Sequence, residues 1–175
     1  HAAAKGRIAQ HLARLLGGAR TVALDASSTV YPLAHILPAP ARGRACFLIT
    51  NGIPLFLELR RRSPAFHVAL TGGEPHPRTD SLVWPLAVKS LEGLRFDVAV
   101  VSAAGVMEDE GAVFDSTAEG PAVKQAFLAR ATRRILAVDR SKLGNTAPYP
   151  LGSLADFDVL VTEDGPRELP RRRVR

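Results

Sequence analysis

The sequence predicts an α/β fold: a mostly parallel open sheet flanked by helices on both faces. Six short strands are nearly continuous apolar runs, as expected of strands buried on both faces. Longer stretches with helical periodicity separate them, so strands and helices alternate along the chain. The strands are expected at 21–25, 45–50, 67–72, 97–103, 134–139 and 158–163, and the helices at about 2–17, 29–37, 53–62, 80–91 and 118–132.

Each element has its own local signal. In the first helix, Ile8, Leu12, Leu15 and Leu16 share one face because they are spaced at helical intervals. The segment GGEPHPRTD (72–80) is predicted to be a loop because glycine and proline interrupt it. The six strands read, in order, TVALD, ACFLIT, HVALTG, DVAVVSA, RILAVD and DVLVTE.

The chain of 175 residues fits one domain that can bury a substantial core. Hydrophobic residues make up 46% of it and charged residues 23%, which is typical of a folded domain. The sequence has no run of 18 apolar residues, and its N-terminus lacks the apolar core of a signal peptide. We therefore expect no membrane partner and a cytoplasmic location.

The cysteine and histidine content predicts no metal and no cofactor. Cys46 is the single cysteine, so no internal disulfide can form. It lies inside an apolar strand, which favours a small buried side chain over a nucleophile. No two of the five histidines have the spacing that places a pair of imidazoles on one metal ion.

The net charge of +6 is concentrated at one end of the chain. The segment 165–175, GPRELPRRRVR, holds five arginines and one glutamate, and so contributes +4. A basic segment without apolar periodicity is most simply a solvated or disordered tail. The nearly neutral remainder shows no helix-turn-helix and no basic stripe interleaved with aromatic residues, so we expect no direct contact with nucleic acid.

Polar or glycine-rich turns follow all six predicted strands. The carboxyl ends of parallel strands lie along one edge of the sheet, where such folds bind ligands. Glycines let backbone N–H groups approach a ligand, hydroxyls add donors, and a helix starting at Thr29 would add its free amides and dipole. These groups together suit a phosphate. The turns contain Asp25, Ser27, Ser28 and Thr29, then Thr50 and Asn51, Gly72 and Gly73, Ser102 to Gly105, Asp139, Ser141 and Lys142, and Thr162 and Glu163.

Lys124 and Lys142 are the candidates for charge that faces a phosphate. Asp25, Glu119 and Asp139 are candidates to accept hydrogen bonds from sugar hydroxyls. Each turn also has a purely structural interpretation, because a serine after a strand often caps a helix and a glycine pair often forms a tight turn.

The order of these motifs resembles the effector-binding domain of the DeoR family of bacterial transcriptional regulators. The resemblance runs from about Lys5 to Asp164. It is carried by LDASST, ITNG, LTGGE, the strand and turn at 97–105, the pair Val123-Lys124, AVDRSKLG (137–144) and VTED.

The resemblance implies a fold similar to ribose-5-phosphate isomerase and glucosamine-6-phosphate deaminase. It implies a sensor of phosphorylated sugars or related metabolites at 1–164, followed by the basic tail at 165–175. Members of the family carry an N-terminal winged helix-turn-helix that binds operator DNA, and this chain contains none. We therefore expect a repressor of sugar metabolism whose operator contact lies in that other domain. A homo-oligomer is also expected, because palindromic operators are usually read by symmetric assemblies.

Three positions depart from the family pattern. Ser27 stands where the first turn usually has glycine. Trp84, in SLVWP, occupies a second usual glycine position, so we expect it to reshape or partly fill the pocket. In the family an acidic residue lies four positions before the lysine. Here that position is Gly120, and Glu119 lies one position earlier, which leaves open whether Glu119 reaches the site.

Two other classes of function stay open at this point. Related folds isomerise sugar phosphates with an acid, a base and a lysine, and Asp25, Asp139, Glu119 and Lys124 have the right chemical types. The displacement of Glu119 disfavours this reading, and we expect no enzyme activity. A scaffold without a ligand explains the fold but not the row of polar turns.

Overall fold

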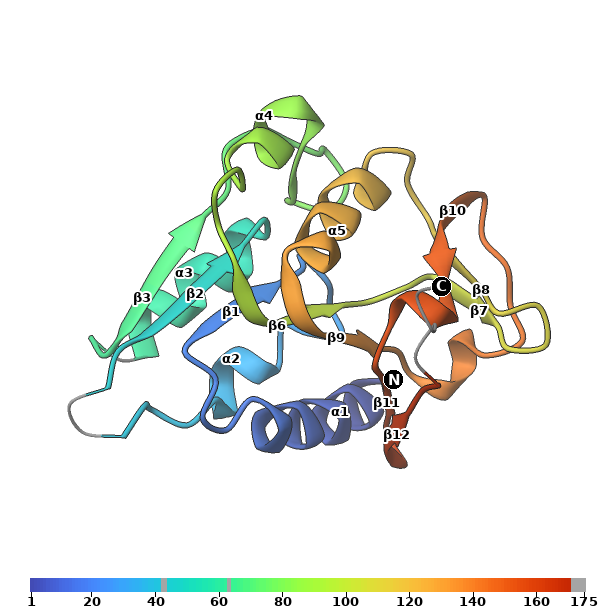
Figure 1. The fold of residues 1–175 in the computed structure, drawn as a ribbon, viewed down its shortest axis with the longest axis horizontal. Coiled ribbons are helices and arrows are strands. Elements are labelled where there is room, and N and C mark those ends of the chain that lie inside the picture. Colours follow the sequence, from blue (N-terminus) through green and yellow to red (C-terminus); the bar gives the residue numbers. More distant parts are fainter. Residues whose placement is uncertain (42–43, 63, 171–175) are drawn as a thin grey trace.

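A twisted sheet of mainly parallel strands forms the centre of the computed structural model, which describes residues 1–41, 44–62 and 64–170 (Figure 1). Within that part of the chain the sheet has seven strands, in the order β12-β11-β9-β6-β1-β2-β3. Only β12 runs antiparallel to its neighbour. The strands are β1 (Thr21–Leu24), β2 (Cys46–Thr50), β3 (Phe66–Leu70), β6 (Phe96–Val101), β9 (Ala131–Ala137), β11 (Val159–Thr162) and β12 (Gly165–Glu168).

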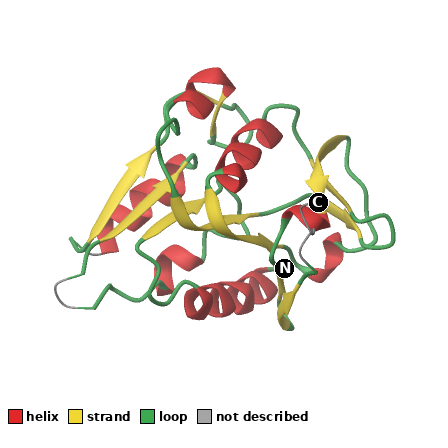
Figure 2. Cartoon of the chain, viewed as in Figure 1, coloured by secondary structure: helices red, strands yellow, loops and turns green. Residues whose placement is uncertain are grey.

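Helices cover both faces of this sheet (Figure 2). Successive side chains of a strand point to opposite faces, so Val22 and Leu24 pack against one group of helices and Ala23 against the other. The predicted fold class is confirmed. The first group is α1 (Ala2–Leu15), α2 (Leu33–Ile36) and α3 (Ile53–Arg62), and the second is α4 (Trp84–Lys89) and α5 (Gly120–Ala129).

The structure adds elements that the apolar pattern did not predict. A small antiparallel sheet packs beside α5 in the order β10-β8-β7, and β4 pairs with β5 in a two-stranded sheet. Two short 3-10 helices occur near the C-terminal end. These elements are β4 (Glu74–Pro75), β5 (Leu82–Val83), β7 (Gly105–Met107), β8 (Ala112–Asp115), β10 (Tyr149–Ser153), η1 (Arg140–Lys142) and η2 (Leu154–Asp156).

Three sequence-based expectations are corrected. The helix expected at 29–37 is only α2, because residues 27–32 form turns, and the helix expected at 80–91 begins at Trp84 after β5. The tail expected from residue 165 is not disordered at its start, since Gly165–Glu168 forms β12 and pairs with β11. The arginine-rich residues 171–175 lie outside the described residues.

The order of the strands reverses at β1. From β1 the chain continues to β2 and β3 on one side, whereas β6, β9 and β11 lie on the other. In open α/β sheets ligands bind outside the carboxyl ends of strands at such a reversal. The turn after β1 and the turn after β6 therefore define where a site is expected.

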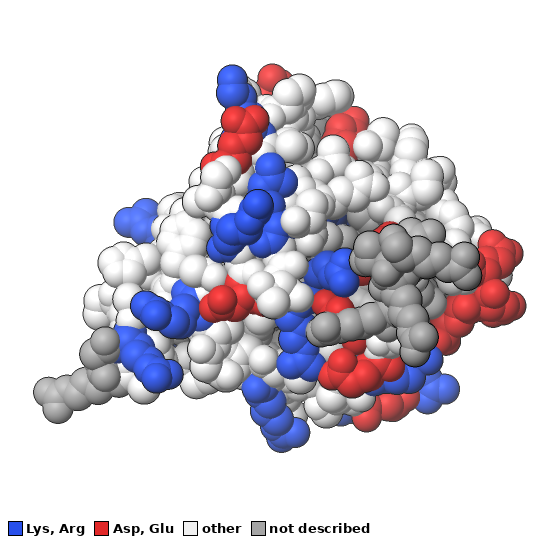
Figure 3. Space-filling view, in the orientation of Figure 1, with Lys and Arg blue, Asp and Glu red and all other residues white. Residues whose placement is uncertain are grey.

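Charged groups of both signs share the face seen in Figure 3. Acidic side chains gather at the end where the hairpin of β7 and β8 lies, and the turn of that hairpin reads Glu108-Asp109-Glu110. In the described part of the chain, no helix has the length and apolar character to cross a membrane. No three His, Cys, Asp or Glu side chains among those same residues are grouped as a metal site requires.

Candidate functional site: a polar cleft at the strand reversal

At the point where the strand order reverses, a buried carboxylate connects two strands of the sheet. Asp25 follows β1 and is fully buried. Its Oδ2 accepts hydrogen bonds from the Ser102 backbone N–H and from the Ser102 hydroxyl, both at 2.8 Å. Asp25 thus joins the ends of β1 and β6, and it lies beneath the cleft instead of lining it.

Lys124 of α5 reaches this carboxylate from the other side. Its Nζ lies 3.3 Å from Asp25 Oδ2 and 2.8 Å from Asp115 Oδ2, and it donates to the Ser102 carbonyl at 2.9 Å. Burial would lower the pKa of Lys124, but the charges of Asp25 and Asp115 and their hydrogen bonds outweigh burial and raise it above its ordinary value. Lys124 is therefore an ammonium whose charge is balanced by two carboxylates.

Asp115 supplies the acid that the family resemblance placed at position 120. Gly120 has no room for a side chain, because a Cβ there would lie 2.9 Å from both Asp115 Oδ2 and Thr117 Oγ1. Asp115 Oδ1 accepts hydrogen bonds from the backbone N–H groups of Ser116 and Thr117, which fixes the carboxylate beside Lys124. Glu119 is not in this group: its Oε2 lies 3.7 Å from His76 Nε2, outside the cleft.

The turn after Asp25 contains three backbone N–H groups without a hydrogen-bond partner among the described residues. Ser27 closes it, since the Val30 N–H donates to the Ser27 hydroxyl at 3.1 Å and the Tyr31 N–H donates to the Ser27 carbonyl at 2.9 Å. The backbone N–H groups of Ser27, Ser28 and Thr29 make no hydrogen bond to any described residue. No helix begins at Thr29, so the expected contribution of a helix dipole there is wrong, and the turn itself provides the amides.

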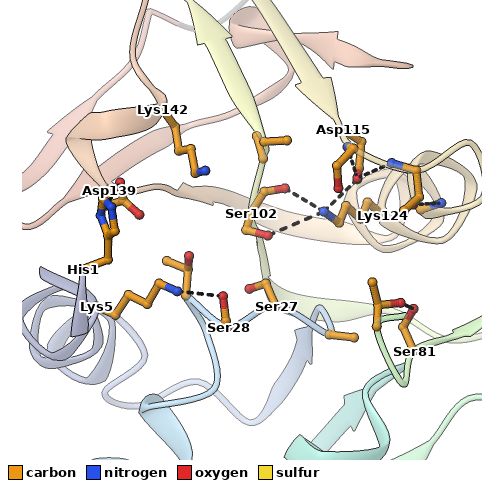
Figure 4. Close-up of a pocket in the computed structure, with 18 of the residues that line it drawn as sticks. His1, Lys5, Ser27, Ser28, Ser81, Ser102, Asp115, Lys124, Asp139 and Lys142 are labelled. Atoms are coloured by element: carbon orange, nitrogen blue, oxygen red, sulfur yellow. Dashed lines mark hydrogen bonds and ion pairs between the residues drawn. The ribbon is translucent and has the colours of Figure 1, made fainter. Parts of the chain in front are cut away.

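Two lysines extend toward the cleft without a carboxylate partner in the described structure (Figure 4). Lys5, in the first turn of α1, donates from Nζ to the Ser28 hydroxyl at 2.8 Å. Lys142, at the end of η1, enters from the opposite side. The buried Asp139 lies next to His1 and accepts hydrogen bonds from the Ser141 N–H and hydroxyl.

The opposite wall comes from Asn51 and from the turn between β4 and β5. Asn51 accepts from the Ala26 N–H at 3.0 Å and donates to the Leu82 carbonyl at 3.1 Å, which connects the two walls. The hydroxyls of Thr79 and Ser81 lie 2.7 Å apart. The cleft is open to solvent on one side and has a volume of about 380 Å³, and its polar lining includes Lys5, Ser27, Ser28, Thr29, Asn51, Thr79, Ser81, Ser102, Asp115, Ser116, Thr117, Lys124, Asp139, Ser141 and Lys142.

Several predicted site residues lie outside the cleft. Thr50 is buried and accepts from the Gly52 N–H at 3.0 Å. Gly72 and Gly73 allow β5 and α4 to pack closely, since a Cβ on Gly73 would lie 2.4 Å from the Val83 carbonyl oxygen and 2.9 Å from the Ala87 side chain. Gly105 does the same for the segment after η1, where a Cβ would lie 2.4 Å from the Asn145 carbonyl oxygen. These residues support the walls of the cleft without lining it.

Trp84 does not close the pocket, which corrects the expectation from its sequence position. Its side chain is 51% exposed on α4 and does not line the cleft. Its backbone has φ 75°, in the left-handed region that favours glycine. The usual glycine at this position is therefore explained by backbone conformation, and not by space for a ligand.

The sequence motifs did not identify Lys5, Thr79, Ser81 or Asp115 as site residues. Lys5 belongs to a polar helix face that looks solvated in the sequence. Thr79 and Ser81 lie in a predicted loop. Asp115 ends β8, a strand of four residues whose apolar run is too short to indicate a strand by itself.

Comparison with known proteins places the chain in a family. The sequence profile described as the DeoR C terminal sensor domain matches residues 1–164, and the chain belongs to this family. The L-fucose operon activator of Escherichia coli (strain K12) is 28% identical over 164 residues, which cover 94% of this chain and 65% of that protein. The glycerol-3-phosphate regulon repressor of the same organism is 24% identical over 93% of this chain and 62% of its own length. The chain thus spans less than two thirds of these relatives, which are transcriptional regulators and not enzymes.

Solved structures confirm the expected likeness in fold. Ribose-5-phosphate isomerase A from Methanocaldococcus jannaschii superposes with a TM-score of 0.56 at 16% identity, over 79% of this chain and 53% of that chain. The β subunit of eIF2B from Chaetomium thermophilum gives a TM-score of 0.62 at 13% identity, over 94% of this chain and 50% of that one.

Proposed function

We propose that this chain is the effector-binding domain of a repressor of sugar metabolism. A phosphorylated sugar, or a related metabolite, binds in the cleft and controls operator binding by an N-terminal winged helix-turn-helix domain. The regulator acts in the cytoplasm as a homo-oligomer. The phosphorylated ligand, the repression of transcription and the homo-oligomeric assembly all go beyond the family assignment.

The distribution of charge in the cleft carries the proposal. Lys124 is balanced by Asp25 and Asp115, whereas Lys5 and Lys142 have no carboxylate partner among the described residues. The three unbonded amides of residues 27–29 lie beside Lys5. Cations and free backbone N–H groups together favour a phosphate dianion.

The rest of the cleft suits a polyhydroxylated body. Asp115 and Asp139 can accept hydrogen bonds from hydroxyls, and Asn51, Thr79 and Ser81 offer amide and hydroxyl groups. The volume of about 380 Å³ is in the usual range for a small-molecule site. The names of the relatives also point to carbohydrate metabolism, since one concerns the L-fucose operon and another the glycerol-3-phosphate regulon.

The isomerase alternative has no specific support. The relatives are regulators, and Lys124 and its carboxylates form a closed ion-pair group without the expected Glu119. Control of DNA binding requires instead that the ligand bind one conformation or assembly more tightly than another.

Saturation-transfer NMR tests the proposal. The domain is mixed with phosphorylated sugars and with their unphosphorylated parents, and each sample is followed for hours. We expect transfer to at least one phosphorylated sugar, with affinity about tenfold or more above that of its parent. Equal binding of both forms would contradict a phosphate site, conversion of the sugar would indicate an enzyme, and absence of binding across the panel would reject the proposal.

A charge variant tests the position of the phosphate. Ser28→Asp puts a negative charge beside Lys5 and the free amides, so we expect it to abolish binding of the phosphorylated sugar. Gln10→Glu adds the same charge on the exposed face of α1 and is the matched control. If Ser28→Asp retains the wild-type affinity, the phosphate lies elsewhere.

A further inference from the structure

The first turn of α1 forms part of the cleft. Lys5 lies one turn into the helix, and its Nζ donates to the hydroxyl of Ser28, in the turn with the free amides. His1 lies next to Asp139 in the same cleft, at 3.8 Å between Nδ1 and Oδ1 (Figure 4). A helix that otherwise packs against the sheet thus brings a cation to the ligand site.

The rest of α1 is held in a different way. Ile8, Ala9 and Leu12 are buried in the core, and the helix contacts α2, β11 and β12. Residues 2–5 contribute no buried side chain. Among the described residues, the polar side-chain interactions between residues 1–5 and the body of the domain are the two in the cleft, Lys5 with Ser28 and His1 with Asp139.

We propose that Lys5 binds the phosphate of the effector, and that this contact fixes the first turn of α1. Nζ of Lys5 already lies beside the Ser28 turn, so it can contact an anion held there with little rearrangement. The inference rests on the proposed function in one respect, namely that the effector carries a phosphate.

The position of this contact gives it a regulatory role. The chain begins beside the cleft (Figures 1 and 4). A domain joined before His1 would therefore leave the sensor at the rim of the cleft, four residues from the proposed anion contact. Fixing the first turn fixes the direction in which that connection leaves, so the effector acts on a preceding DNA-binding domain through α1.

Inorganic phosphate is the probe, because it tests the Lys5 contact independently of which sugar the effector contains. Phosphate is titrated into the ¹⁵N-labelled domain, for the wild type and for Lys5→Met, Lys5→Arg and Lys89→Met. We expect Lys5→Met to weaken phosphate binding by about tenfold or more and Lys5→Arg to retain most of it. Lys89→Met removes an exposed lysine on α4 and should leave the affinity unchanged.

Amide hydrogen exchange reads out the effect on α1. The N–H groups of residues 5–8 bond to the carbonyls of residues 1–4 in the first turn. With phosphate at ten times its dissociation constant, we expect their exchange to slow by up to about tenfold in the wild type and to stay unchanged in Lys5→Met.

The outcomes are distinct. Wild-type affinity in Lys5→Met, or unchanged exchange of residues 5–8 at saturating phosphate, would overturn the inference while leaving the sensor function intact. Lys5-dependent phosphate binding without binding of any phosphorylated sugar would support the contact and reject the proposed effector. If the wild type does not bind phosphate, the inference is overturned.

Discussion

Replacing Lys124 with methionine removes the positive charge between two buried carboxylates. Methionine keeps an unbranched side chain of similar length, so the packing of α5 against the sheet changes little. Asp25 and Asp115, which lie 3.3 and 2.8 Å from Nζ in the wild type, are left without their counter-charge. The Ser102 carbonyl loses its hydrogen bond as well.

The expected loss of stability is large. Removing one partner of a buried ion pair costs about 3–5 kcal/mol, because the remaining charge is left uncompensated. A domain of this size loses roughly 2–4 °C in melting temperature for each kcal/mol, so Lys124→Met should melt about 6–20 °C below the wild type. Lys142→Met removes a lysine without a carboxylate partner in the described structure and should change the stability by less than about 0.5 kcal/mol.

Urea unfolding and calorimetry of four proteins test this reasoning: wild type, Lys124→Met, Lys142→Met and the double variant Lys124→Met with Asp115→Asn. The double variant removes one of the unpaired charges, so it should be more stable than Lys124→Met alone by about 0.5–3 kcal/mol. A loss below about 1 kcal/mol in Lys124→Met, or no recovery in the double variant, would refute the view that Lys124 is needed to neutralise the two carboxylates.

Three further predictions concern positions around the site. Trp84→Gly relieves a positive φ whereas Trp84→Ala retains it, so in urea unfolding the glycine variant should be more stable than the alanine variant by about 1 kcal/mol. Both should keep the wild-type effector affinity, and tighter binding would place Trp84 at the cleft after all. Gly120→Ala should lower the free energy of unfolding by about 1–3 kcal/mol in the same assay, because its Cβ would clash with the carboxylate of Asp115. Unchanged stability would mean that the loop around Asp115 moves to accept the methyl group. Burial, and after it the charge of Asp97, raises the pKa of the Cys46 thiol, so thiol reagents should label it only after unfolding. The thiol therefore ionises at a lower pH in the unfolded chain than in the folded protein. The free energy of unfolding of the wild type, relative to that of Cys46→Ala, should be constant at lower pH and fall as the pH rises through 9.0. Rapid labelling of the folded protein would contradict the burial of this thiol.

The sequence predicts the parallel sheet well because its strands are buried on both faces. Such strands are continuous apolar runs, and all six appear close to their expected positions. Strands with one exposed face carry a weaker signal. β8 has only the short apolar run Ala-Val-Phe before Asp115, and β10 contains proline and glycine, so the small sheet was not predicted.

For the candidate site, sequence order predicts which turns lie at the ligand edge but not which side chains reach it. Ser27, Ser28, Thr29, Asn51, Asp139 and Lys142 line the cleft as their strand-end positions indicate, and Lys124 reaches it from α5. Gly72 and Gly105 follow strands as well, yet contact with other segments of the chain takes up the space beside them. Lys5 comes from a helix whose packing on the sheet, unknown from the sequence, brings its side chain to the cleft.

The reversal of strand order at β1 also determines when this domain can first recognise a ligand. Asp25, Ser102, Lys124 and Lys142 meet only when β1 pairs with β6 and β9 follows, so no short segment of the chain contains the complete site. Contacts between such distant positions form late and slowly during folding. A newly made chain therefore cannot respond to its effector until residue 142 has been synthesised and the central strands have paired, and the effector then stabilises only the complete fold.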